Sequence, residues 1–208
     1  MSGKKEKQMT PSVEKAVETI RQMGGTVRTA EAIREGVHPR TLYALRDCGT
    51  LEQISRGVYR LADLGVLSSP DLVTVASRVP HAVICLISAL SFHNLTTQIP
   101  HKVSIAIDRD SRVPQVHYPP ITVHRFASVC FKAGIEEHHI DGVTVRIYSP
   151  EKTLADCFKF RNKIGMDVVL EALKLYKTRK KFNLGDLLKY AGTCRVESVM
   201  KPYLEATV

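Results

Sequence analysis

Three short helical patterns follow one another within the first 65 residues, and their tight spacing constrains the fold more than any other feature of the chain. Each pattern opens with a capping residue or a proline, which suits the first turn of a helix, and closes with glycine. The openings are Thr10-Pro11, Thr29 and His38-Pro39, and the closures are Gly24-Gly25, Gly36 and Gly49. We expect Ala30 and Ile33 to face inward from the second helix, and Leu42 and Leu45 from the third.

A hairpin pattern follows the third helix. Two strand-like runs, 51–54 and 58–61, flank Ser55-Arg56-Gly57, in which the glycine supplies the positive φ that a tight turn needs. Three helices followed by a hairpin is the element order of a winged helix-turn-helix. The sequence therefore predicts this fold for the N-terminal part.

The rest of the chain has a different, mixed pattern. Alternating runs at 103–107, 121–123 and 143–147 are typical of strands, and the last sixty residues have helical patterns. We expect an α+β protein in which an N-terminal winged helix-turn-helix precedes a mixed α/β domain that ends in a helical segment. The predicted boundaries are 1–9 for a flexible basic arm, 10–65 for the winged helix and 66–208 for the C-terminal domain, with strands over 82–148 and helices over 150–206.

Charge is distributed unevenly along the chain. Residues 1–65 carry 11 basic and 8 acidic side chains, residues 66–158 carry 8 of each, and residues 159–208 carry 11 and 5. Both ends are basic and the middle is neutral, which suits a polyanionic partner that touches two separate regions. A solvated basic surface would give the same distribution, so charge alone does not decide between the two.

The third helix is the candidate to enter a DNA major groove, which admits one α-helix. With its two leucines turned inward, a 100° step per residue places Arg40, Tyr43 and Asp47 on the opposite side. Arg40 lies nearest the N-terminus and is the best placed for a bidentate contact to guanine. The predicted DNA-binding residues are Arg28, Thr29, Pro39, Arg40, Thr41, Tyr43, Arg46, Arg56 and Arg60.

Residues suited to catalysis or metal binding form no convincing set. Asp108 and Asp110 follow a strand, but Arg109 and Arg112 alternate with them and no Glu-x-Lys pattern follows. The adjacent pair His138-His139 cannot share one strand face, and no third ligand lies nearby. The five cysteines include no CxxC pair, which argues against a disulfide framework or a zinc knuckle. We expect no enzymatic activity, no metal and no cofactor.

Two polar clusters in the C-terminal part leave alternatives open. Lys152, Asp156 and Lys159 are spaced to line one helix face, either as a salt-bridged surface or as a functional polar site. The basic run Lys177, Arg179, Lys180 and Lys181 lies at a helix end, where it complements the helix dipole or contacts phosphates. No apolar run approaches the ~20 residues that span a bilayer, and no signal-peptide pattern is present, so we expect a cytoplasmic protein without a membrane partner.

Three stretches carry a resemblance to a known family. They are GTL at 49–51 with RGVYRL at 56–61, ISALSFHNLT at 87–96 and VRIYSPEKTLADCFK at 145–159. In this order and at this chain length, they resemble the AbiEi family, the antitoxins and autoregulators of type IV toxin–antitoxin systems, which act in abortive infection and phage defence.

The resemblance implies a division of roles. An N-terminal winged helix would repress the operon by binding inverted repeats in promoter DNA, and neighbouring copies on that DNA would contact one another. A C-terminal domain would counter a nucleotidyltransferase-like toxin without binding it stably, and Lys152, Asp156 and Lys159 are candidates for an antitoxin face. The alternatives are a regulator with a ligand-sensing C-terminal domain and no toxin partner, or a nuclease or transferase whose catalytic part is 70–208.

Overall fold

The computed structural model describes residues 11–205, which divide into two compact units. Unit 1 contains the residues up to Arg78 and the short segment His139–Val143, and unit 2 contains Val79–His138 and the residues from Thr144 onward. The predicted arm, 1–9, and the predicted cap Thr10 lie outside the described residues. Helices alternate with the strands of two sheets, so the expectation of a mixed α and β protein is confirmed.

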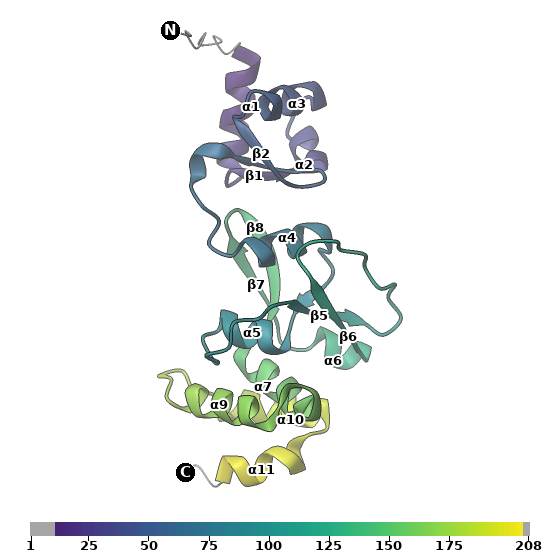
Figure 1. Ribbon diagram of the computed structural model, residues 1–208, viewed down its shortest axis with the longest axis vertical. Coiled ribbons are helices and arrows are strands. Elements are labelled where there is room, and N and C mark those ends of the chain that lie inside the picture. The colour runs from purple at the N-terminus through teal and green to yellow at the C-terminus, as the bar shows by residue number, and fades with distance from the viewer. Residues whose placement is uncertain (1–10, 206–208) are drawn as a thin grey trace. The chain divides into compact units, whose positions relative to one another are not determined.

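Unit 1 consists of helices packed on a small antiparallel sheet (Figure 1). Its elements are α1 (Pro11–Gln22), β1 (Thr26–Arg28), α2 (Thr29–Arg34), α3 (Pro39–Asp47), β2 (Leu51–Ser55), β3 (Val58–Leu61), the single turn η1 (Ala62–Leu64) and α4 (Pro70–Arg78). The strand order is β1-β3-β2. The β2–β3 hairpin forms where the sequence predicts it, with Gly57 at φ +74° in its turn. Strand β1 is absent from the sequence prediction, because three residues carry too short a pattern.

The core of unit 1 explains where its helices lie. Ile20 of α1, Leu42 and Leu45 of α3, and Leu51 of β2 are buried in one cluster. The apolar residues of α1 and α3 recur at helical spacing, so each helix presents one apolar stripe to the sheet. Both leucines of α3 therefore point inward, as the sequence predicts.

Helix α2 differs from the prediction. Ala32 is fully buried, whereas Ile33 is 46% exposed and Ala30 is also exposed. The expectation that Ala30 and Ile33 face inward is wrong, because the six-residue helix is too short for periodicity to fix its orientation. The N-cap is Arg28, whose backbone N–H donates to Glu31 Oε2 at 3.1 Å, rather than Thr29.

Unit 2 is built on a mixed five-stranded sheet in the order β6-β5-β4-β8-β7. Strand β4 pairs antiparallel with β5 and parallel with β8, while β5 and β6 are parallel. The elements are β4 (Val83–Ile84), α5 (Leu86–Phe92), β5 (Val103–Asp108), β6 (Ile121–Phe126), α6 (Ser128–Lys132), β7 (Ile135–Ile140), β8 (Val143–Tyr148), α7 (Pro150–Lys159), α8 (Arg161–Ile164), α9 (Met166–Lys177), α10 (Leu184–Cys194) and α11 (Glu197–Glu205).

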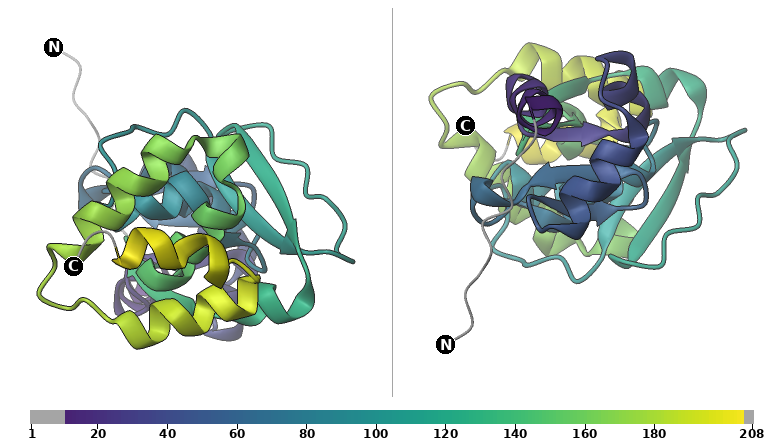
Figure 2. Two further views of the ribbon diagram at one scale, coloured as in Figure 1. Left: turned by 90° about the horizontal axis from the view of Figure 1, so that it is seen from below. Right: turned by 90° about the horizontal axis from the view of Figure 1, so that it is seen from above.

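Helix α7 is the centre of unit 2 and packs against α5, α9, α10 and α11. Figure 2 (left) shows α9, α10 and α11, green to yellow, side by side. Seven consecutive residues of α7, Lys152–Phe158, are buried. Over these seven residues the helix has no exposed side, so the polar residues among them lie in the core, whereas Lys159 at the end of the helix is exposed.

Candidate nucleic-acid interface

Helix α3 begins at a side-chain cap that fixes its exposed N-terminus. The backbone of His38 is extended, Pro39 occupies the first helical position, and the Nδ1 atom of His38 accepts a hydrogen bond from the Arg40 N–H at 3.1 Å. Before this cap, Gly36 has φ +84° and Val37 is buried. The buried valine anchors the turn, so the first turn of α3 is held at the surface of unit 1.

The exposed side of α3 carries the residues that the sequence predicts there. Arg40, Asp47 and Tyr43 are exposed, and Thr41 and Pro39 are half-buried. The guanidinium of Arg46 pairs with Asp47 at 2.7 Å and lies 5.4 Å from the centre of the Tyr43 ring. Within residues 11–205, the side chain of Arg40 makes no hydrogen bond or ion pair, whereas that of Arg46 is held by a neighbouring carboxylate.

The β2–β3 hairpin also carries an exposed cation. Arg56 is exposed in the hairpin turn. The Thr29 N–H and hydroxyl both donate to the Gly57 carbonyl, at 2.9 and 3.2 Å. Thr29 thus ties the start of α2 to the hairpin, so its hydroxyl already has an acceptor within the protein.

Two of the arginines predicted to contact DNA donate hydrogen bonds to backbone carbonyls of unit 1. Arg60 is only 4% exposed and donates to the carbonyls of Gly65 and Leu64 at 2.6 and 3.1 Å. Arg28 is half-buried and donates to the Ala76 carbonyl at 3.2 Å. The prediction that Arg60 contacts DNA is wrong, because its guanidinium lies inside the unit. A period-two pattern in a strand of four residues could not show that every side chain is buried.

The three residues predicted as an antitoxin face separate in the structure. Lys152 and Asp156 are completely buried, with Nζ and Oδ2 2.5 Å apart, whereas Lys159 is exposed. The expectation of a solvated salt-bridged face is therefore wrong for the first two residues. The i, i+4 spacing predicts the ion pair correctly but does not report its burial.

The buried pair is embedded among aromatic rings and a thiol. Lys152 Nζ lies 4.2 Å from the centre of the Tyr148 ring and 5.0 Å from that of Phe126. The Cys194 thiol donates to Asp156 Oδ1 at 3.3 Å. Burial raises the pKa of the Asp156 carboxyl above its ordinary value, and Lys152 opposes that shift. Both members have partners inside the core, as a structural ion pair requires.

The remaining candidate is the basic run of unit 2. The basic run occupies the end of α9 and the following loop, where Lys180 and Lys181 are exposed and Arg179 and Lys177 are half-buried.

No group of three histidine, cysteine or carboxylate side chains suited to a metal occurs among residues 11–205. Within the same range, no helix is both long and apolar enough to cross a membrane.

Comparison with known proteins supports the resemblance seen in the sequence. Residues 14–62 match the family model described as "Transcriptional regulator, AbiEi antitoxin". This segment runs from α1 to the end of the β2–β3 hairpin and includes the exposed side of α3. The likeness to the AbiEi antitoxin and transcriptional-regulator family is thus confirmed over residues 14–62.

A solved structure is similar in fold over most of the chain. The crystal structure of the RV2827C protein from Mycobacterium tuberculosis superposes with a TM-score of 0.54 and 13% identity, over 95% of this chain and 82% of that one. At this identity the likeness concerns the fold alone. The search of curated proteins gave no match.

Proposed function

We propose that this protein is a sequence-specific DNA-binding autorepressor and antitoxin, in which unit 1 is a winged helix-turn-helix. The observation that carries the proposal is the pairing of an exposed α3 N-terminus with an exposed cation in the hairpin turn, within the segment that matches the regulator family. Recognition helices contact base edges through their N-terminal residues. Arg40 would contact a guanine in the major groove, and Arg56 would contact the minor groove or its phosphates.

The other residues of α3 would position the helix on DNA. Tyr43, Thr41 and Arg46 lie on or beside the exposed side, within reach of phosphates or a thymine methyl. Pro39 fixes the entry of the helix. The partners we propose are promoter DNA with inverted repeats and neighbouring copies of this chain on that DNA.

A gel-shift titration with the DNA that precedes the protein's own gene tests the first part. Arg40→Ala should weaken operator binding by about 1–3 kcal/mol and relax the preference at one base pair. Arg78→Ala removes an exposed arginine from α4 and serves as the matched control, with unchanged affinity expected. Equal losses on operator and random DNA would show that Arg40 contacts phosphate alone.

For the antitoxin part, we propose that the exposed end of α7 contributes to neutralising a nucleotidyltransferase-like toxin. Lys159 is the one member of the predicted face that lies at the surface. Lys159→Ala should retain its thermal midpoint and operator affinity but impair rescue of cells that express the toxin encoded beside this gene. Lys163→Ala, an exposed control one turn further on, should rescue normally. Full rescue by Lys159→Ala would remove this face from the proposal.

The rival function is a regulator without a toxin, whose C-terminal unit senses a ligand. The observation that favours it is a cavity in unit 2, described below. The two readings differ in the rescue assay, because a ligand sensor would leave toxin-expressing cells unprotected.

A further inference from the structure

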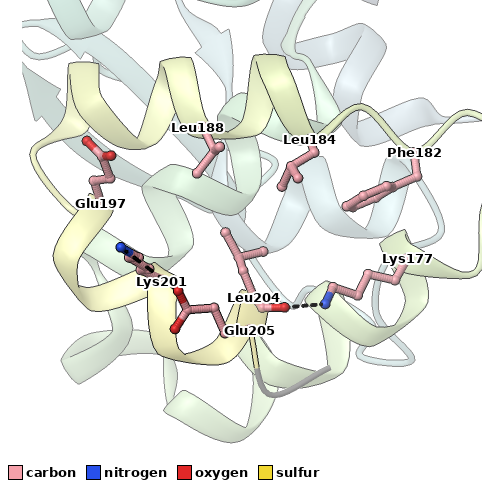
Figure 3. A pocket seen from close by; sticks show the side chains of 8 residues that line it. All are labelled: Lys177, Phe182, Leu184, Leu188, Glu197, Lys201, Leu204 and Glu205. Atoms are coloured by element: carbon pink, nitrogen blue, oxygen red, sulfur yellow. Dashed lines mark hydrogen bonds and ion pairs between the residues drawn. The ribbon is translucent and has the colours of Figure 1, made fainter. Parts of the chain in front are cut away.

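A cavity of about 620 Å³ lies in unit 2 between the end of α9, helix α10 and helix α11. Its lining consists of Phe182, Leu184, Leu188 and Leu204 together with Lys177, Lys201, Glu197 and Glu205 (Figure 3). The volume falls in the range of small-molecule sites, which combine a mostly apolar lining with a few polar groups.

Helix α10 has one wide apolar face, of which one edge is buried and the other is exposed. Leu187 and Ala191 are buried in the core of unit 2, whereas Leu184 and Leu188, one turn apart, are 44% and 37% exposed. Figure 3 shows both of these leucines directed toward Leu204 across the cavity. Their apolar surface is in contact with water, so a ligand that covers it would gain the free energy of apolar burial.

The walls are held in place by contacts within the unit. The ring of Phe182 lies 5.4 Å from that of Tyr176, whose hydroxyl donates to Glu151 and accepts from the Asn183 N–H. Lys177 Nζ donates to the Leu204 carbonyl at 3.1 Å, which joins α9 to α11. A cavity that exists before binding costs little ordering entropy on binding.

Charge differs between the two ends of the cavity. Figure 3 places Lys177 and Phe182 at one end and Glu197 at the other. Residues 174–189 carry six basic side chains and one acidic side chain, whereas α11 carries two glutamates and one lysine. The lysine and glutamate of α11, Lys201 and Glu205, are 3.9 Å apart and two-thirds exposed, so they largely neutralise each other. The positive end is therefore that of Lys177.

We propose that this cavity binds a small amphipathic anion: an apolar chain or ring system over Leu184, Leu188 and Leu204, with one acidic group at the Lys177 end. The apolar lining selects the body of the ligand, and the position of the basic residues selects its head group. This site is independent of the DNA-binding role proposed for unit 1.

Titration of the full-length protein with 8-anilinonaphthalene-1-sulfonate provides the test, and the absence of tryptophan keeps the fluorescence background low. Emission should rise and saturate at one probe per chain. Decanoate should displace the probe at a concentration at least tenfold lower than decanol. The double variant Leu184→Gln, Leu188→Gln should lose at least tenfold in probe affinity. Leu170→Gln, which changes a leucine of α9 that is 38% exposed and outside the cavity, should bind like wild type.

A variant and a matched control test whether Lys177 binds the acidic group of the ligand. Lys177→Gln keeps a donor for the Leu204 carbonyl but removes the charge, so decanoate affinity should fall several-fold while decanol affinity stays unchanged. Lys189→Gln, on α10 and outside the cavity, should change neither. Equal effects on decanoate and decanol would overturn the anionic head group.

Three further results would overturn the site itself. The first is probe binding that survives the double leucine variant. The second is equal loss of probe binding in that variant and in Leu170→Gln. The third is a concentration-dependent dimer in sedimentation that is lost in the double variant but is not dissociated by decanoate. The apolar surface would then belong to an interface between copies.

Discussion

Helix α3 of unit 1 and helix α7 of unit 2 begin alike, with a side-chain cap followed by proline at His38-Pro39 and Ser149-Pro150. Each also contains a cation paired with an aspartate. The Arg46–Asp47 pair is 39% and 64% exposed, whereas the Lys152–Asp156 pair is 0% exposed on both sides. An exposed pair can exchange its partner for a phosphate at little cost, while a buried pair has no alternative partner and specifies the core. The same residue types thus suit binding in one unit and folding in the other.

Breaking the buried pair should have the largest effect. Lys152→Met leaves the Asp156 carboxylate buried without its cation, so the free energy of unfolding of unit 2 should fall by about 3–5 kcal/mol. Lys201→Met, which breaks the exposed i, i+4 pair with Glu205, should cost at most about 1 kcal/mol. Urea unfolding followed by circular dichroism measures both.

The double variant Lys152→Met, Asp156→Leu sharpens this test. Replacing a buried ion pair by apolar residues of similar volume is often neutral or stabilising, so most of the lost stability should return. A double variant no more stable than the single one would mean that the pair contributes through its contacts with Tyr148, Phe126 and Cys194, rather than through mutual neutralisation.

The second largest effect concerns the salt dependence of DNA binding. If the basic run touches DNA, changing Arg179, Lys180 and Lys181 to glutamine should lower the salt dependence of operator affinity by about 0.9 per lost phosphate contact, or about 2.7 in all. The control removes the same charge from the neutral middle of the chain, through Lys102, Arg109 and Arg112 to glutamine. Equal slopes in the two triple variants would confine DNA contacts to unit 1.

These comparisons show what sequence patterns can and cannot give. The helix starts marked by proline, α1 at Pro11 and α3 at Pro39, and the alternating strands β5 and β8 lie where they are predicted, because their signals are local. Strand β7 (Ile135–Ile140) was missed, since an edge strand with four consecutive charged or imidazole side chains has no apolar alternation. Helix α10 continues through Gly192 and ends at Cys194, where Arg195 forms the C-cap with φ +59°.

For the candidate sites too, a local pattern predicts some features and not others. The exposed side of α3 follows from the positions of Leu42 and Leu45 alone. The burial of Lys152 and Arg60 does not. The Lys152–Asp156 pair is covered by residues distant in the sequence, Phe126 and Cys194, and the contacts of Arg60 with the carbonyls of Leu64 and Gly65 depend on the path of the backbone. The sequence pattern does not predict the cavity of unit 2, because Leu184 and Leu188 lie beside Leu187 and Ala191 on one wide apolar face of α10, and the pattern does not show which edge of that face is buried.

The third largest effect concerns the N-caps of α3 and α7, whose removal should lower stability by different amounts. Ser149 is buried and its hydroxyl accepts from the Lys152 N–H at 3.2 Å, so Ser149→Ala should cost about 1–2 kcal/mol of stability. His38 is exposed, and His38→Ala should cost only about 0.5–1 kcal/mol. Thermal unfolding of both variants measures the difference. A larger loss for His38→Ala would show that the α3 cap is held by more than one hydrogen bond.

The smallest effect concerns a buried histidine of unit 2. His93 Nε2 lies 2.8 Å from the Tyr148 carbonyl, to which the neutral ring donates. Burial lowers the pKa of His93, opposed by the Tyr148 carbonyl and by Glu136 and assisted by His138 and Arg179. The unfolded chain therefore takes up a proton near its ordinary pKa of about 6.5, before the folded protein does.

Because the unfolded chain binds this proton at a higher pH than the folded protein, the free energy of unfolding should be highest above about pH 6.5. It should fall as the pH drops toward the pKa of His93 in the folded state. His124, whose pKa is also lowered by burial, contributes in the same direction. Unfolding free energies at pH 7.5 and 5.5 should differ less in His93→Gln than in wild type, because the glutamine amide donates without titrating. His101→Gln, at an exposed histidine of the same unit, should retain the wild-type difference. If the His93→Gln profile parallels wild type, the acid sensitivity of unit 2 arises elsewhere, and His124→Gln then tests whether the half-buried ring of His124 is its source.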